Sequence, residues 1–138
     1  MDDEVNDVLG VEQGRVRLRE FSDQWALLYE AEAAAIQAAA GAGIIEIRHY
    51  GSTAIPRIMA KPILDILAGV HRLDDAFGFI EPLAAIGYEF VPAAGVAGHH
   101  IFGKGSPRTH LLHFVEYDGP DWRKSVLFHK RMTEDRHL

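Results

Sequence analysis

Two predicted strands joined by a glycine–serine turn constrain the fold of this chain more than any other feature. Residues 44–50 are rich in β-branched and aromatic side chains, which favours a strand, and Gly51 is expected to end it. Residues 62–70 form a nearly continuous apolar run, which is typical of a strand buried on both faces of a sheet. The sequence therefore predicts an α/β fold in which the turn lies close to a buried strand.

The turn has the composition of a phosphate-binding site. Gly51 lets a ligand approach the backbone closely, while Ser52 and Thr53 offer hydroxyl groups and open N–H groups of the kind that hold phosphate oxygens. Lys61 follows in the basic segment that leads to the second strand. We therefore expect Gly51, Ser52, Thr53 and Lys61 to contact the phosphates of a substrate.

Asp65 interrupts the apolar run of the second strand. An ionised carboxylate is costly to bury unless it is paired, hydrogen-bonded or bound to a metal, so its position needs a reason. One explanation is a divalent cation held by Asp65 beside the phosphate-binding turn. The other is a salt bridge to Lys61 or Arg48, or a cap on a neighbouring loop, since ion-pair networks also place acids in such positions.

Four segments together resemble the signature of the GrpB family, which belongs to the nucleotidyltransferase-like superfamily. They are EFSDQW at 20–25, EIRHYGSTAIP at 46–56, AKPILDI at 60–66 and RTHLLHFV at 108–115. The resemblance covers residues 15 to 130. It implies a nucleotidyltransferase-like mixed β-sheet flanked by helices, but it supplies no substrate, because the family is itself largely uncharacterised.

One departure from the wider superfamily bears on mechanism. Active nucleotidyltransferases carry a second carboxylate two residues after the first, because residues i and i+2 of a strand face the same way and can share a metal pair. Here that position is Leu67, which cannot ligate Mg²⁺. The resemblance implies that GrpB proteins often lack the second acid. Either other ligands compensate or catalysis has been lost.

Substitute ligands are concentrated late in the chain, where six of the eight histidines lie: His99, His100, His110, His113, His129 and His137. An imidazole can bind a metal, act as a general base or contact phosphate when protonated, and the alternative for each is a hydrogen-bonded core or rim residue. His110 and His113 lie in the family-like block, but the period of two in a strand makes them face opposite ways unless the strand is irregular.

Arg108 is a further candidate in the same block. It follows a Gly-Lys-Gly-Ser-Pro turn and could contact a phosphate or carboxylate through two parallel hydrogen bonds. The alternative is an ordinary hairpin whose surface Arg is only solvated. We therefore predict Asp65 and His113 as catalytic residues, Asp65 as the metal ligand, and Arg108 and His110 as substrate-binding residues in addition to the turn.

Length and composition favour a single domain over residues 1–138. The chain of 138 residues with 48% hydrophobic content can bury one sizeable core. Helices are expected over 22–40 and 74–86 and after residue 119, with a short one after the turn and a loose arm over 1–14. The last helical part is shorter than is typical of the family, and dimerisation could cover the apolar surface that this leaves.

Several classes are excluded or disfavoured. The absence of cysteine removes disulfides, thiolate metal sites and cysteine nucleophiles. A net charge of −6 argues against general nucleic-acid binding. No segment approaches the ~20 apolar residues needed to cross a bilayer, and the acidic start is unlike a secretory signal, so we expect a cytoplasmic protein without membrane contact.

Three functions remain open from the sequence. The leading one is binding of a nucleotide or phosphorylated small molecule with Mg²⁺ or Mn²⁺ on Asp65, with nucleotidyl transfer if the site is active. The second is a noncatalytic nucleotide-binding or regulatory module that has lost the second metal-binding carboxylate. The third is a metal-dependent phosphoesterase built on His110 and His113.

Overall fold

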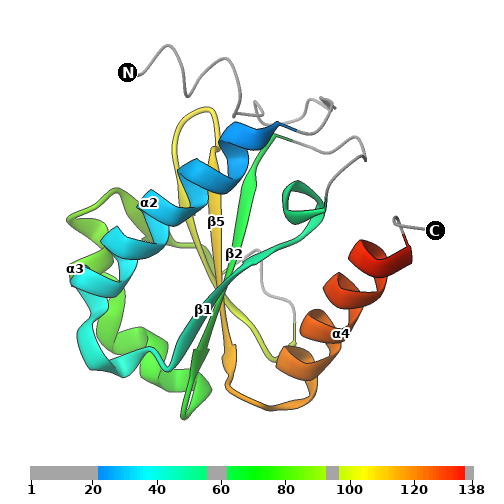
Figure 1. Cartoon of the computed structure of the whole chain (residues 1–138). Coiled ribbons are helices and arrows are strands. Elements are labelled where there is room, and N and C mark those ends of the chain that lie inside the picture. The colour runs from blue at the N-terminus through cyan, green and yellow to red at the C-terminus, as the bar shows by residue number, and fades with distance from the viewer. Residues whose placement is uncertain (1–21, 56–61, 93–96, 136–138) are drawn as a thin grey trace.

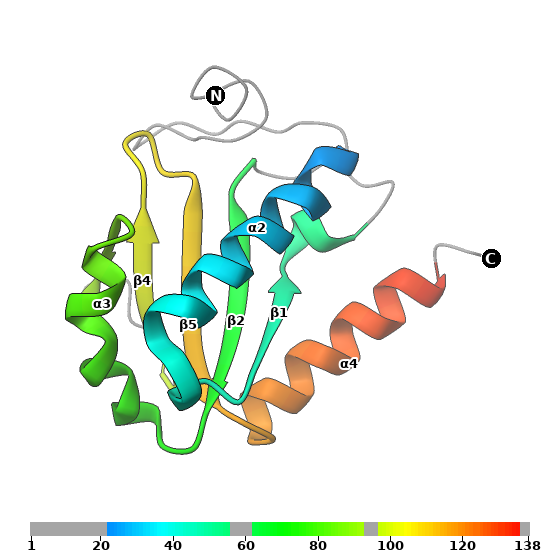
Figure 2. The same ribbon diagram turned by 60° about the vertical axis from the view of Figure 1, so that its left-hand side comes forward.

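The computed structural model describes residues 22–55, 62–92 and 97–135, and the arm expected over 1–14 lies outside these ranges. Within them a single sheet has the strand order β1–β2–β5–β4–β3 (Figures 1 and 2). The strands are β1 (Glu46–Tyr50), β2 (Leu64–Val70), β3 (Tyr88–Phe90), β4 (His100–Lys104) and β5 (His110–Glu116). The helices are α2 (Asp23–Ala40), α3 (Ile80–Ala84) and α4 (Pro120–Asp135), with 3₁₀ turns η1 (Gly41–Gly43), η2 (Ser52–Ala54) and η3 (Leu73–Phe79).

The sheet is mixed, which confirms the predicted α/β class. β2 runs parallel to β5, whereas the β1–β2, β4–β5 and β3–β4 pairs are antiparallel. A parallel pair needs a crossover, and here the chain leaves β2 through η3, α3, β3 and β4 before it returns as β5. The central strands β2 and β5 therefore have a neighbour on each side, and β1 and β3 form the edges.

Alternation along β2 and β5 divides the interior into two cores. Ile66 and Ala68 of β2 join Leu112 and Phe114 of β5 in the larger core, which also contains Ile36 of α2. The smaller core lies on the other face, under α4, and consists of Leu67, Val115 and Trp122. The sheet thus has helices on both faces, as the buried character of residues 62–70 predicted.

Helix α2 matches its sequence prediction closely. Ser22 is the N-cap, and its side chain accepts a hydrogen bond from the Gln24 N–H at 3.2 Å. Gly41 ends the helix with φ +68°, a conformation that glycine adopts without steric cost. Trp25 and Ile36, at helical spacing, are fully buried, and Ile36 packs in the core with residues of the sheet.

The expected helix over residues 74–86 is wrong in type over its first half. The structure has the 3₁₀ segment η3 (Leu73–Phe79) and then only the short α3 (Ile80–Ala84). The Asp75 carboxylate accepts a hydrogen bond from the Arg72 N–H at 3.1 Å, which satisfies the first turn locally. Gly78 lies near the junction of η3 and α3, and glycine at this position disfavours one continuous α-helix over residues 74–86.

An ion-pair network around the buried Glu32 joins α2 to the last residue of β4 and the first residue of β5. Lys104 Nζ donates to both carboxylate oxygens of Glu32 at 2.9 Å, and His110 Nε2 lies 3.3 Å from the same carboxylate. The His110 Nδ1 is 2.7 Å from Thr109 Oγ1, and the Lys104 ammonium lies 5.5 Å from the centre of the Tyr88 ring. Glu32 is only 8% exposed, so it depends on these partners.

Replacing Glu32 tests the importance of this network for stability. Glu32→Gln leaves Lys104 and His110 without their carboxylate partner and should lower the free energy of unfolding by about 2–3 kcal/mol. Urea denaturation measures the change. Glu30→Gln on the exposed side of the same helix is the control and should stay within about 0.5 kcal/mol of the parent. Equal stability of the two variants would contradict the network's role.

Two histidines are held neutral inside the fold. Burial lowers the pKa of His49 to about 4, and nearby His129 lowers it in the same direction. Burial also lowers the pKa of His110 to about 4, with Glu32 opposing the shift and Lys104 adding to it. Between about pH 4 and 6.5 the unfolded chain therefore binds these protons more readily than the folded one. Stability present above pH ~6.5 is lost as the pH falls toward 4.

The pH dependence of unfolding checks this assignment. His49 stacks on Tyr29 at 4.8 Å and hydrogen-bonds Thr53, and glutamine can keep the hydrogen bond without titrating. Between pH 6.5 and 4, the free energy of unfolding of the parent should fall more steeply than that of His49→Gln. The difference should approach about 1.4 kcal/mol per pH unit, the slope for one proton. Identical slopes in urea denaturation series would contradict a buried neutral His49.

No helix within the described ranges is both long and apolar enough to span a bilayer.

Candidate functional site

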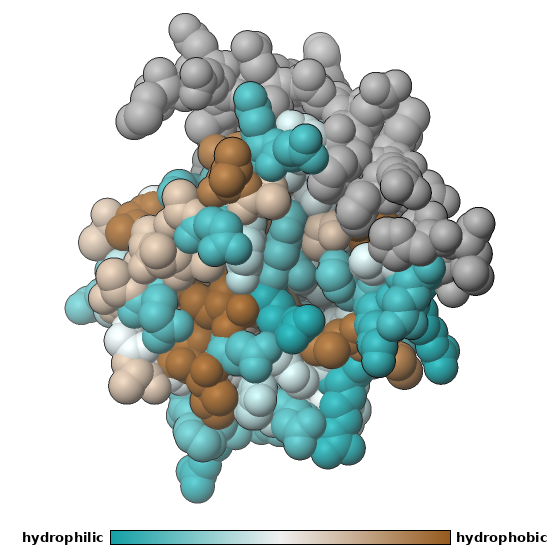
Figure 3. Space-filling view, viewed as in Figure 1, coloured by the Kyte–Doolittle hydropathy of each residue, from teal (hydrophilic) through white to brown (hydrophobic). Residues whose placement is uncertain are grey.

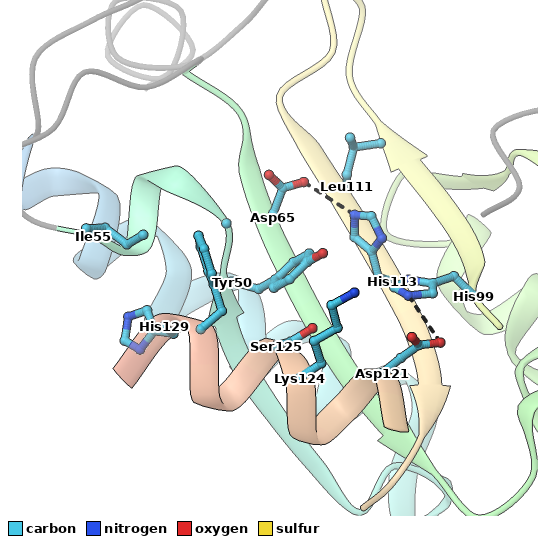
Figure 4. Close-up of a pocket in the computed structure, with 12 residues that line it drawn as sticks. Tyr50, Ile55, Asp65, His99, Leu111, His113, Asp121, Lys124, Ser125 and His129 are labelled. Atoms are coloured by element: carbon cyan, nitrogen blue, oxygen red, sulfur yellow. Dashed lines mark hydrogen bonds and ion pairs between the residues drawn. The ribbon is translucent and has the colours of Figure 1, made fainter. Parts of the chain in front are cut away.

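A cavity of about 510 Å³ lies between α4 and one face of the sheet (Figure 4). Its sheet side is built from the end of β1 with the following turn, from β2, from β5 and from the segment before β4. The residues from these parts are Tyr50, Gly51, Asp65, Leu111, His113 and His99. The α4 side supplies Asp121, Lys124, Ser125, Phe128 and His129, and Ile55 closes one end. A volume of this size suits a small molecule.

The predicted turn and the predicted acid meet at this cavity. Gly51 has φ +73°, and a Cβ placed on it would lie 2.7 Å from Asp65 Oδ2. Only glycine permits so close an approach, so the turn is packed directly against the carboxylate. The Ala54 N–H donates to the Gly51 carbonyl oxygen at 3.2 Å and closes the first turn of η2. The short helical element predicted after Gly51 is thereby confirmed.

Among the described residues, Asp65 is paired with a histidine and not with Arg48. Its Oδ1 lies 3.4 Å from His113 Nε2, and its side chain remains about a quarter exposed at the cavity. Arg48 instead pairs with Glu46 at 3.1 Å, and Lys61 lies outside the described residues. The predicted catalytic pair, Asp65 and His113, is therefore in direct contact on adjacent strands.

A second histidine–carboxylate pair stands beside the first. His99 Nε2 lies 3.7 Å from Asp121 Oδ2, and the His99 and His113 rings meet edge to face at 5.6 Å. Both Nδ1 atoms are buried and have no hydrogen-bond partner among the residues that the structure describes. Burial lowers the pKa of His99, as does His113, while Asp121 opposes the shift. The lowered pKa of His99 favours a neutral imidazole at this position of the cavity wall.

Other predicted binding residues lie away from the cavity. Thr53 is 1% exposed, and its hydroxyl faces His49 at 3.0 Å and not the cavity. Arg108 donates to Glu89 at 3.2 Å, with its guanidinium packed over Gly103 of β4. The Ser52 side chain and Lys61 fall outside what the structure describes. Of the predicted phosphate contacts, Gly51 alone is placed at the cavity by the described residues.

His110 faces the opposite side of the sheet from His113. It is 7% exposed and belongs to the Glu32 network under α2. The alternation predicted for β5 is therefore confirmed, and the two histidines diverge. The structure therefore separates His110 from Asp65, because a regular strand turns the two side chains to opposite faces of the sheet. The same divergence removes the basis for a phosphoesterase built on His110 and His113.

Sequence reasoning missed the whole α4 side of the site. Asp121, Lys124, Ser125 and Phe128 share one face of the helix through i, i+3, i+4 and i+7 spacing. This spacing is visible in the sequence, but it does not tell which strand the face will meet. His129 on the same helix fixes the contact, since its Nε2 donates to the Ala54 carbonyl oxygen of η2 at 3.0 Å.

Leu67 occupies the position of the absent second carboxylate, and the structure gives it a packing role. It is 1% exposed and packs with Val115 and Trp122 beneath α4. Within the described ranges, no group of three His, Asp or Glu side chains converges on one point that could hold a metal ion. The described residues therefore supply no ligand set for a pair of metal ions, and Asp65 is the described carboxylate that the sequence predicted as a metal ligand.

The fold and the site define an α/β protein with a nucleotidyltransferase-like sheet. The chain superposes on Cid1 in complex with the UTP analogue UMPNPP (TM-score 0.60, 15% identity, 99% of this chain and 40% of that chain). At this identity the likeness is one of fold alone. The family model described as "GrpB protein" matches residues 15–138, and the chain belongs to the GrpB family.

Relatives within the family agree with this placement. The chain is 37% identical over 127 residues to the "Glutamate-rich protein GrpB" of Alkalihalophilus pseudofirmus, covering 88% of this chain and 73% of that protein. It is 35% identical to "UPF0157 protein YqkA" of Bacillus subtilis over 83% of this chain, but it spans only 34% of that protein. A crystal structure of the conserved protein GrpB from Enterococcus faecalis superposes with TM-score 0.80 at 27% identity, over 88% of this chain and 74% of that one.

Restoring an acid at position 67 tests whether that position can still serve as a ligand. Leu67→Asp puts an unpaired carboxylate into the small core and should lower the free energy of unfolding by more than about 3 kcal/mol. Leu67→Met keeps volume and apolarity, so it should cost less than about 1.5 kcal/mol. Chemical denaturation of both variants measures this. A Leu67→Asp protein as stable as Leu67→Met would show that the position is open to a ligand.

Proposed function

We propose that this GrpB-family chain binds a nucleotide or another phosphorylated small molecule in the cavity between the sheet and α4, as a module without two-metal transfer chemistry. The observation that carries the proposal is the packing of the Gly51 turn directly on Asp65 at the cavity wall. A glycine turn with open N–H groups is suited to phosphate oxygens. Lys124 also lines the cavity and makes no ion pair with any described residue, so it is free to meet an anionic group.

The charge balance of the cavity supports the proposal of a bound cation. Asp65 and Asp121 contribute two negative charges and Lys124 one positive charge, while the three lining histidines are neutral unless protonated. A phosphate at Gly51 would lie beside the Asp65 carboxylate, where like charges repel. One Mg²⁺ or Mn²⁺ shared between Asp65 and the phosphate removes this repulsion. Binding of a phosphorylated ligand should therefore depend on a divalent cation and on Asp65.

Nucleotidyl transfer is the second candidate, and the contact between Asp65 and His113 favours it. In this pair His113 Nε2 faces the Asp65 carboxylate at 3.4 Å and His113 Nδ1 is buried, so the proton acceptor that the pair presents to the cavity is the Asp65 carboxylate, with His113 positioning it. This carboxylate would accept the proton of an attacking hydroxyl while that oxygen bonds to the α-phosphorus and pyrophosphate leaves. The buried Leu67 weighs against this function, because it removes the second carboxylate position.

Calorimetric titration tests the binding proposal. Each nucleoside triphosphate is titrated into the protein with Mg²⁺, with Mn²⁺ and with EDTA. At least one should bind with a divalent cation, and EDTA should weaken it about ten-fold or more, which corresponds to about 1.4 kcal/mol. Asp65→Asn should weaken binding in Mg²⁺ to a similar degree, because it removes the charge that holds the cation. Release of pyrophosphate in the same mixtures would establish the second candidate.

The matched control is Asp74→Asn. Asp74 is a largely exposed acid whose carboxylate pairs with His100 at 3.0 Å, away from the cavity. Its replacement should leave the affinity and the metal dependence unchanged. Equal affinity of Asp65→Asn and the parent would remove Asp65 from the site. The absence of binding to any nucleotide or sugar phosphate, with or without metal, would overturn the proposal as a whole.

A further inference from the structure

The cavity has a charged end and an apolar end. Figure 4 shows Asp65, His113 and His99 grouped at one end, Ile55 and His129 at the other, and Tyr50 between them. Ile55 is 3% exposed and supplies an apolar wall. A simple phosphate or sugar phosphate would use only the charged end. The apolar end is suited to a second, uncharged part of the ligand.

Phe128 is the most unusual residue of the apolar end. It lines the cavity, yet its residue surface is 57% exposed, and its ring contacts no aromatic ring of a described residue. The space-filling view shows apolar surface among the polar side chains in the region of α4 (Figure 3). Burial of such a ring against a ligand gains free energy in proportion to the apolar area removed from water. Phe128 is therefore available for a ligand contact.

Tyr50 presents a second ring to the same space. Its ring meets His113 edge to face at 5.1 Å, which links its position to the charged pair. Lys124 lies four residues before Phe128 on α4, so the two side chains project from the same face of the helix one turn apart. A ligand that reaches from Gly51 past Lys124 to Phe128 would need an anionic group and a flat apolar group in one molecule.

We infer that the ligand class is a nucleotide and not a sugar phosphate, with its base contacting Phe128 and the Tyr50 ring that lies between the two ends of the cavity. This inference rests on the proposed function, because it assumes that the phosphate end binds at Gly51 and Asp65. Stacking on aromatic side chains tolerates every base, since each base has a π-face. Phe128 is thereby a specificity-determining residue that favours nucleotides over phosphorylated sugars without choosing among bases.

The test compares ligands with and without a base. Titrations with Mg²⁺ use the four ribonucleoside 5′-monophosphates and ribose 5-phosphate, which carries the phosphate and sugar alone. The parent should bind at least one nucleoside monophosphate about five- to hundred-fold more tightly than ribose 5-phosphate, the range expected for one stacked base. Phe128→Ala should abolish this preference and leave the affinity for ribose 5-phosphate unchanged. Phe128→Trp should retain the preference.

Leu127→Ala is the matched control. Leu127 is 46% exposed on the same helix and does not line the cavity, so its removal should leave both affinities unchanged. Both exposed positions tolerate truncation, and circular dichroism verifies the fold of each variant. Equal affinity of the parent for nucleoside monophosphates and ribose 5-phosphate would overturn the inference while the proposed function stands. A Phe128→Ala protein that keeps the preference would overturn the inference in the same way. Failure of all five ligands to bind would overturn the inference, and the proposed function would fall with it only if no nucleoside triphosphate or sugar phosphate binds either, with or without metal.

Discussion

The parallel pairing of β2 with β5 is the constraint on which the rest of the structure depends. Its register sets Asp65 beside Leu111 and Leu67 beside His113, so alternate residues of both strands face α4 together. A slip of one residue in β2 would turn Asp65 into the main core and Ile66 outward. Because Ile66 and Ala68 are fully buried, that slip is strongly disfavoured. The hydrophobic pattern of the larger core thereby fixes the position of the acid on the opposite face.

The two faces of the sheet use charge differently. On the α2 face, Glu32 is buried with Lys104 and His110, and each group is satisfied within the protein, as a structural ion-pair network requires. On the α4 face, the buried Nδ1 atoms of His99 and His113 have no partner within the described ranges, and Asp65 stays partly exposed beside a glycine turn. Unsatisfied groups and open space occur together there, which is typical of a binding site and not of a packed core.

The sequence predicted the α/β class, the limits of α2, the opposite orientation of His110 and His113, and the meeting of Gly51 with Asp65. These depend on local alternation and turn chemistry, which are visible along the chain. It did not predict the partners of long side chains. Arg108 pairs with Glu89, which is distant in sequence, and the inward turn of Thr53 depends on His49. The docking of α4, which brings Lys124 and Phe128 to the cavity, is a tertiary result that helical spacing alone cannot specify.

The central claim is that ligand binding takes place on the α4 face of the β2–β5 pair and not on the α2 face. The most direct measurement is a titration of isotopically labelled protein with a magnesium nucleotide, followed by amide chemical shifts in two-dimensional NMR. The account predicts progressive shifts at Gly51, Asp65 and Lys124, with Glu32 and His110 unchanged. Shifts centred on Glu32 and His110, with none at Gly51 and Asp65, would contradict it.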